Sequence, residues 1–178
     1  MPTLKMNRGT GAGGTNTNKN GLAYEVMTSL REHLNVIETV NTKRLSYEKY
    51  LINNREYIGL QKANLRRYLV SELNPQCERH LEPDEAFVCK DIKKLYILEK
   101  KFQQCAGSAD EKIQTALFKH EFYQEQYPEY DIHYAYVLND WFQQNKYKPE
   151  MRFLQKYGIR VFWSSDDDYV EQVKEWLL

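Results

Sequence analysis

The order of hydrophobic and polar positions predicts several strands, the clearest of them in the middle of the chain. Residues 85–89 and 95–102 are largely apolar and are separated by the polar segment 90–93, a pattern typical of two strands joined by a turn. Residues 132–138 predict a third strand, and residues 159–163 predict a short last one. The central feature that the sequence predicts is therefore a hairpin.

Apolar residues spaced by three and four positions predict a first helix. The helix is expected to begin near Asn20, to bury one apolar stripe, and to carry Glu25 at the edge of that stripe. The residues of the stripe are Leu22, Val26, Leu30, Leu34 and Ile37.

Three further helices are predicted in the second half of the chain. One begins at the capping box over 108–111 and ends before Pro128. Another lies near 149–155, and the last follows the acidic triplet 166–168, because a helix N-terminus favours negative charge. The inward-facing residues are expected to be Ile113, Leu117 and Phe118 in the first of these helices, and Val170, Val173 and Trp176 in the last.

Residues 43–73 mix basic and aromatic side chains, and they predict both helix and strand without clear boundaries. Their excess of Lys and Arg makes this segment a candidate phosphate-contacting surface. A solvated charged face explains the same pattern, so both interpretations stay open.

The succession of predicted elements indicates an α/β fold in a single domain, with a mixed central sheet flanked by helices. Residues 1–20 are rich in Gly, Asn and Thr, and they are expected to form a flexible arm. Residues 21–178 are expected to form the folded domain.

Composition and charge limit the class of protein and its cellular location. The chain has 178 residues, of which 42% are apolar, enough for one ordinary core. Lys plus Arg and Asp plus Glu number 25 each, so the chain lacks the basic excess typical of nucleic-acid binders. It shows no signal-peptide pattern and no membrane-spanning run, and its three cysteines are irregularly spaced. These features favour an intracellular, cytoplasmic protein with no membrane partner.

The predicted hairpin gathers charged side chains at one end. If its turn is centred between Asp91 and Ile92, Asp84 lies opposite Glu99, and such cross-strand partners have Cβ atoms about 5 Å apart. Side chains alternate along a strand, so Glu99 and Lys101 project from the same face. Two carboxylates and an ammonium group are therefore expected close together.

This set of groups suits metal-assisted phosphodiester hydrolysis. Adjacent carboxylates repel each other unless a cation lies between them, and Mg²⁺ prefers oxygen ligands. Asp84 and Glu99 are the candidate Mg²⁺ ligands, and the ion would polarise a phosphoryl oxygen and acidify a bound water. Lys101 can orient or deprotonate that water and stabilise the charge that grows on the phosphate. A surface ion cluster without catalytic function is the alternative.

The same residues resemble a known signature. Pro83 and Asp84, followed by a strand that ends in Glu99 and Lys101 with one residue between them, are similar to the motif of the PD-(D/E)XK nuclease superfamily. The flanking sequence and the segment 11–25 resemble small type II restriction endonucleases, including ones of large algal viruses. The flanking segments that carry this resemblance are 83–87, 97–103 and 107–112.

The resemblance implies a restriction-endonuclease-like core and further site residues. Superfamily members often carry an acidic residue on the first helix and a polar residue on the helix after the motif, and Glu25 and Gln114 match these positions. The alternative for Glu25 is a simple ion pair with a basic neighbour, and the alternative for Ser108 is a helix cap without a DNA contact. The candidate DNA-contacting residues are Asn18, Lys19, Ser108, Lys112 and Gln114.

The chain is therefore expected to be a Mg²⁺-dependent type II endonuclease for double-stranded DNA, of viral or bacterial origin. Residues 1–20 would be its arm and 21–178 its nuclease domain. Cutting both strands of a symmetric site calls for two active sites, so a homodimer is expected. The alternatives are a repair or junction-resolving nuclease that reads DNA shape, and a non-catalytic DNA-binding domain.

Overall fold

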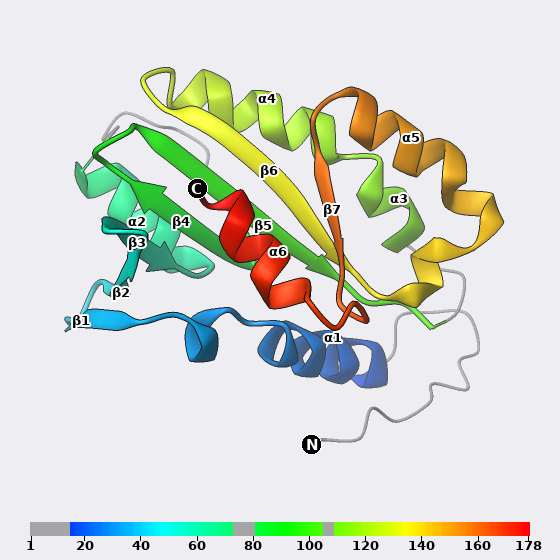
Figure 1. Ribbon diagram of the computed structural model, residues 1–178, viewed down its shortest axis with the longest axis horizontal. Coiled ribbons are helices and arrows are strands. Elements are labelled where there is room, and N and C mark those ends of the chain that lie inside the picture. Colours follow the sequence, from blue (N-terminus) through cyan, green and yellow to red (C-terminus); the bar gives the residue numbers. More distant parts are fainter. Residues whose placement is uncertain (1–14, 73–80, 105–108) are drawn as a thin grey trace.

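A mixed sheet forms the centre of this computed structural model, which describes residues 15–72, 81–104 and 109–178 (Figure 1). Within these ranges the sheet has seven strands, and they lie side by side in chain order. The strands are β1 (Val36–Asn41), β2 (Ser46–Ile52), β3 (Arg55–Leu60), β4 (Glu85–Cys89), β5 (Lys94–Lys101), β6 (Asp131–Leu138) and β7 (Arg160–Trp163).

The direction of the strands follows from what connects them. Strands β1 to β5 are antiparallel to their neighbours, whereas β6 is parallel to β5 and β7 is parallel to β6. Parallel neighbours need a crossover connection, and helices supply it in both places. The described chain is therefore a single-domain α/β fold with a mixed sheet, as the sequence predicted.

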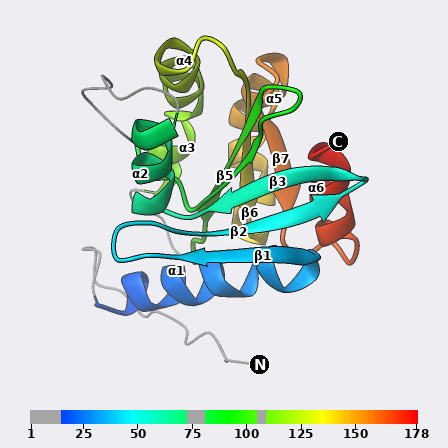
Figure 2. The same cartoon turned by 90° about the vertical axis from the view of Figure 1, so that its left-hand side faces the viewer.

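Helices cover both faces of the sheet (Figures 1 and 2). One face packs against α2, α3, α4 and α5, and the other packs against α1 and α6. The α-helices are α1 (Thr15–Met27), α2 (Ala63–Glu72), α3 (Ala109–Ile113), α4 (Ala116–Gln126), α5 (Lys148–Lys156) and α6 (Tyr169–Trp176). Short 3₁₀ helices are η1 (Arg31–His33), η2 (Asp140–Gln143) and η3 (Asn145–Tyr147). No helix in the described ranges has the length and apolar character that crossing a bilayer requires.

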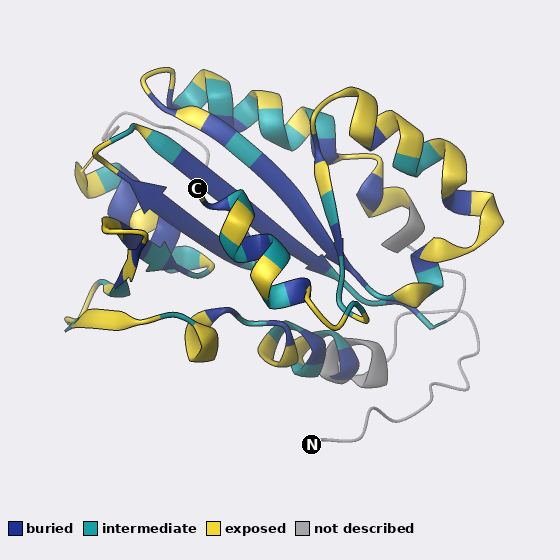
Figure 3. Cartoon of the chain, in the orientation of Figure 1, coloured by how far each residue is buried: buried dark blue, intermediate teal, exposed yellow. Residues whose placement is uncertain are grey.

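The alternation of side chains along β5 divides the core into two layers. Leu95 and Ile97 pack on the face covered by α2 to α5, whereas Tyr96 and Leu98 pack on the face covered by α1 and α6. The central strands are buried along almost their whole length (Figure 3). The same alternation continues into the charged residues at the end of β5, and it decides which face each of them reaches.

Several predicted elements are confirmed. Strand β4, the turn after it and strand β6 lie where the hydrophobic runs predicted them, to within one residue. Helix α5 ends before Gly158, which has a left-handed φ of 72° that favours glycine. Strand β7 and helix α6 follow as expected, and Val173 is buried in the core.

The prediction of the first helix was wrong in its start, its end and its buried side. Helix α1 already begins at Thr15 and ends at Met27. Leu22 and Val26 are 58% and 67% exposed, and Tyr24 is the aromatic residue that the helix buries. Within the helix the apolar spacing therefore marked the solvent face, because Asn20 and Tyr24, one turn apart, fill the space against the sheet. Leu30 of the predicted stripe is buried as expected, but it lies after the end of α1.

The segment after α1 was also misassigned. Ile37 belongs to the strand β1, not to a helix, and it is 48% exposed. Strand β1 lies at the edge of the sheet and buries none of its residues fully, so it lacks the alternation that identifies a half-buried strand.

The helix predicted after Gly107 is two helices. Helix α3 ends at Ile113, which is buried as expected, and α4 begins at Ala116. The prediction that Phe118 points inward was wrong, because it is 60% exposed, and Leu117 is half-buried. Ala116 and Tyr123 form the buried side of α4 instead.

Candidate functional site

The end of the β4–β5 hairpin brings the predicted acidic residues together. The two strands pair with Glu85 opposite Leu98, which is the register that the sequence predicted. One step beyond this pair, an Oδ atom of Asp84 accepts a hydrogen bond of 2.7 Å from the backbone N–H of Lys100. Asp84 therefore lies beside the Glu99–Lys101 end of β5.

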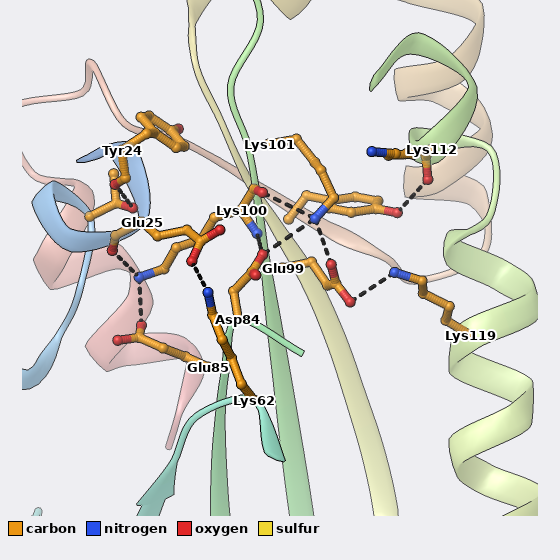
Figure 4. A network of polar contacts seen from close by, with 12 residues as sticks. Tyr24, Glu25, Lys62, Asp84, Glu85, Glu99, Lys100, Lys101, Lys112 and Lys119 are labelled. Atoms are coloured by element: carbon orange, nitrogen blue, oxygen red, sulfur yellow. Dashed lines mark hydrogen bonds and ion pairs between the residues drawn. The ribbon is translucent and has the colours of Figure 1, made fainter. Parts of the chain in front are cut away.

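Lys101 joins the two carboxylates (Figure 4). Its Nζ atom lies 2.6 Å from an Oε atom of Glu99 and 3.3 Å from an Oδ atom of Asp84. It also donates a hydrogen bond of 3.0 Å to the carbonyl oxygen of Lys100. One positive charge is therefore surrounded by three oxygen atoms, two of them from carboxylates.

These three side chains keep contact with solvent. Asp84 and Lys101 are each 15% exposed and Glu99 is 7% exposed. Burial lowers the pKa of Lys101, but the charges of Glu99 and Asp84 outweigh burial and raise that pKa above its ordinary value. Lys101 is therefore an ammonium group at neutral pH.

Lys119 is a site residue that the sequence reasoning missed. Its Nζ atom reaches from α4 to the second Oε atom of Glu99, at 2.8 Å (Figure 4). Burial raises the pKa of Glu99, but Lys101 and Lys119 outweigh burial and hold that pKa below its ordinary value. Lys119 follows Ala116 by three positions and precedes Tyr123 by four, so it lies on the buried side of α4. The sequence alone predicted Leu117 and Phe118 as the inward-facing residues of this helix, so no local pattern pointed to Lys119.

Lys100 points to the opposite face of the sheet. Its Nζ atom lies 3.0 Å from an Oε atom of Glu85 and donates a hydrogen bond of 3.0 Å to the carbonyl oxygen of Glu25. The side chains of Lys100 and Glu85 are 1% and 3% exposed. Glu85 also accepts hydrogen bonds from Ser29 at 2.5 Å and from Gln61 at 3.2 Å. This buried pair ties α1 to the sheet.

Glu25 lies near the cluster, but it is bound to a different lysine. Its carboxylate is 2.6 Å from Nζ of Lys62, the residue before α2. Lys62 has a left-handed φ of 48° and donates its backbone N–H to the carbonyl oxygen of Pro83 at 2.9 Å. The Glu25 contact raises the pKa of Lys62. The loop before Asp84 is therefore fixed to the residue that holds Glu25.

The remaining predicted residues are not part of the cluster of Asp84, Glu99 and Lys101. Lys112 and Gln114 are exposed at the end of α3 and in the break before α4. The carbonyl oxygen of Lys112 accepts a hydrogen bond of 3.0 Å from the Tyr136 hydroxyl. Ser108 lies outside the described residues, and Asn18 and Lys19 lie in the first part of α1, 15–19, whose side chains are not described.

The oxygen atoms around Lys101 Nζ are of the chemical type that a divalent cation such as Mg²⁺ binds. They come from Asp84, Glu99 and the backbone carbonyl of Lys100, and carboxylate and carbonyl oxygens are the ligands that Mg²⁺ takes in proteins. Across the described ranges, no set of three or more His, Cys, Asp and Glu side chains is arranged to hold a metal ion. At the end of β5, the donor set consists of two carboxylates and one carbonyl.

No protein-family model matches this sequence, and no curated protein matches it closely enough to name a relative. The geometry of the charged residues at the end of β5 is therefore the basis for assigning a function.

Proposed function

We propose that this chain is a Mg²⁺-dependent endonuclease for double-stranded DNA, of the PD-(D/E)XK kind. The observation that carries the proposal is the convergence of Asp84, Glu99 and the Lys100 carbonyl oxygen on one positive charge, the Lys101 ammonium group. Two acidic residues and a lysine at adjacent strand ends supply both the ligands for a metal ion and a cation for a phosphate.

The residues have separate roles in this proposal. Asp84 and Glu99 hold Mg²⁺, which supplies charge neutralisation at the phosphate and a more acidic water when it is bound. Lys101 stabilises negative charge on the phosphoryl oxygens and orients or deprotonates the attacking water. Lys119 holds one oxygen of Glu99 and so fixes the rotamer of that carboxylate.

The rest of the site supports a restriction-type enzyme. Glu25 lies on the first helix, and its partner Lys62 is fixed to the Asp84 loop, so we assign Glu25 a supporting role beside the proposed metal site. The hairpin, the parallel strand β6 and the flanking helices would correspond to a restriction-endonuclease-like core in this proposal. A C₂ homodimer would place one site on each DNA strand.

The test is cleavage of duplex plasmid DNA with Mg²⁺ or with EDTA, by the wild type and by Lys101→Ala. Removing one such transition-state contact costs roughly 10²–10³-fold in rate. The matched control is Lys94→Ala, which removes a lysine from the other end of β5, about 23 Å away by the rise of a strand.

Metal-dependent discrete bands that disappear with Lys101→Ala but not with Lys94→Ala support a site-specific endonuclease. Cleavage confined to junctions or other irregular DNA would instead favour a structure-specific nuclease. Binding of DNA without any cleavage in Mg²⁺ or Mn²⁺, unchanged by Lys101→Ala, would overturn the catalytic proposal in favour of a binding domain.

A further inference from the structure

A basic groove lies between helix α2 and the turn that joins β1 to β2. It encloses about 870 Å³. The turn and the helix lie next to each other on the same side of the molecule (Figure 2). Its lining residues include Lys43 and Arg44 from the turn, Arg66 and Arg67 from the helix, and Glu82 from the segment before β4. Four cations therefore face one carboxylate, in a chain whose total charge is zero.

The turn that forms one wall is held in shape by its own side chain. The Thr42 hydroxyl accepts hydrogen bonds from the backbone N–H groups of Arg44 at 3.3 Å and Leu45 at 3.0 Å, and it donates one of 2.9 Å to the Leu45 carbonyl oxygen. Such a local side-chain turn fixes the backbone. Lys43 and Arg44 are exposed on it.

The two walls are also fixed to each other. The Asn64 side-chain oxygen, on α2, accepts hydrogen bonds from the Ser46 backbone N–H at 3.1 Å and from the Arg67 guanidinium at 3.4 Å. The rings of Tyr47 and Tyr68 meet edge to face, with centroids 5.7 Å apart. The groove is therefore built before any ligand binds, which reduces the entropy that binding costs.

The cations of the groove differ from those of the proposed active site in their pairing. Lys62, Lys101 and Lys119 each contact a carboxylate. In the described part of the chain, no carboxylate forms an ion pair with any of the groove cations. The groove cations are Lys43, Arg44, Arg66 and Arg67. Their charge is thus available to an external anion.

The groove is close in sequence to the proposed active site. Glu82, which lines the groove, precedes Asp84 by two residues, and Ala63, which also lines it, follows Lys62. Helix α2 rises about 1.5 Å per residue, which places Arg67 about 6 Å along the axis from Ala63, the length of about two nucleotides of one duplex strand. Arginine suits this role because its planar group binds phosphate in two-point contacts.

We infer that this groove binds the phosphodiester backbone of double-stranded DNA on one side of the scissile phosphate. The inference rests on the proposed endonuclease function and adds where the substrate lies. It predicts sequence-independent contacts, because phosphates carry no base information.

The experiment measures binding of a labelled mixed-sequence duplex to the full chain in EDTA, over a series of salt concentrations. Two paired variants each remove the positive charges of one wall. The first combines Arg66→Gln with Arg67→Gln on the helix, and the second combines Lys43→Gln with Arg44→Gln on the turn. Each should weaken binding at least about tenfold and reduce the slope of log affinity against log salt by about 2. Arg152→Gln on α5 is the control, since it removes an exposed arginine from a helix at the opposite end of the sheet (Figure 1).

The outcomes separate this inference from the proposed function. If both paired variants keep the affinity and slope of Arg152→Gln while the wild type cleaves DNA in Mg²⁺, the groove inference is overturned and the nuclease proposal stands. If the wild type neither binds nor cleaves the duplex, both are overturned. If one paired variant loses DNA affinity and also has a lowered melting temperature, the affinity of the other paired variant decides. The turn and the helix are separate elements, so a folding defect in one does not affect the other.

Discussion

The β4–β5 hairpin carries charged groups on both faces of the sheet at the same end, and the two sets have different surroundings. On one face Asp84, Glu99 and Lys101 keep 7–15% of their side-chain surface exposed. On the other face Lys100 and Glu85 are 1% and 3% exposed. Adjacent residues of one strand thus belong to two environments, because successive side chains point to opposite faces.

This difference separates the arrangement that we propose to be catalytic from a structural one. The buried pair satisfies a single ammonium with one carboxylate and one helix carbonyl, and it fastens α1 to the sheet. The open cluster places three oxygens around one cation that solvent can reach. Burial lowers the pKa of Lys100, and Glu85 offsets only part of that effect, whereas the pKa of Lys101 is raised. Lys100 therefore has a structural role on one face of the sheet, and Lys101 is a candidate catalytic group on the other.

The largest expected effect is on stability, from breaking the buried pair. Lys100→Met leaves the Glu85 carboxylate buried without its cation, and such changes cost about 3–5 kcal/mol. The free energy of unfolding, measured by urea denaturation, should fall by that amount. The double variant Lys100→Met with Glu85→Leu should recover part of the loss. Equal stability of Lys100→Met and the wild type would show that the pair is not structural.

Magnesium binding should distinguish the two faces. A ligand at about a hundred times its dissociation constant stabilises the folded state by about 2.7 kcal/mol. For a chain of this size that raises the melting temperature by several degrees, at about 2–4 °C per kcal/mol. Glu99→Gln should abolish the rise measured between EDTA and Mg²⁺, and Glu85→Gln should keep it. A rise that survives in Glu99→Gln would place the metal elsewhere.

Lys119 should have a smaller effect on the open cluster. Lys119→Gln removes one of the two cations that hold the pKa of Glu99 below its ordinary value, so that pKa should rise. The acid limb of the pH–rate profile for cleavage should therefore move to higher pH, with a loss of about tenfold or less at neutral pH, equivalent to about 1.4 kcal/mol. An unmoved acid limb would mean that Lys119 does not act through Glu99.

The smallest effect should come from an ion pair outside both clusters. Glu48 accepts hydrogen bonds from the Arg31 guanidinium, and these hold its pKa below the ordinary value although burial opposes them. A lowered folded-state pKa stabilises the fold above the unfolded pKa, and this contribution is lost as the pH falls through the folded value. Since Arg31 is half-exposed, Arg31→Gln should cost below about 1 kcal/mol at neutral pH and nothing in acid, by urea denaturation at both pH values. An equal cost at both pH values would contradict this assignment.

The sequence was sufficient for the parts of the fold whose pattern is local. The hairpin register followed from its turn, and the facing of Asp84 and Glu99 followed from that register. Strand β6 has a continuous apolar run, and helix α5 has a clear boundary. These features depend on residues that are neighbours in the chain.

The sequence was insufficient to predict which side chains are buried or meet when this depends on packing between distant segments. Leu22 and Val26 have helical spacing but face solvent, because the sheet selects Tyr24 as the buried residue of α1. Lys119 reaches Glu99 only because α4 crosses the face of β5 and β6, which no local pattern encodes. The groove likewise joins residues more than 20 positions apart, although the basic character of its segment was visible.

The most direct test of the central claim compares cleavage of plasmid DNA by Glu99→Gln and Glu85→Gln, each normalised to its folded fraction. The account predicts that the wild type cuts only with Mg²⁺, that Glu99→Gln loses roughly 10² or more in rate, and that Glu85→Gln retains most of its activity per folded molecule. Cleavage that persists in EDTA, or equal rates in the two variants, would contradict it.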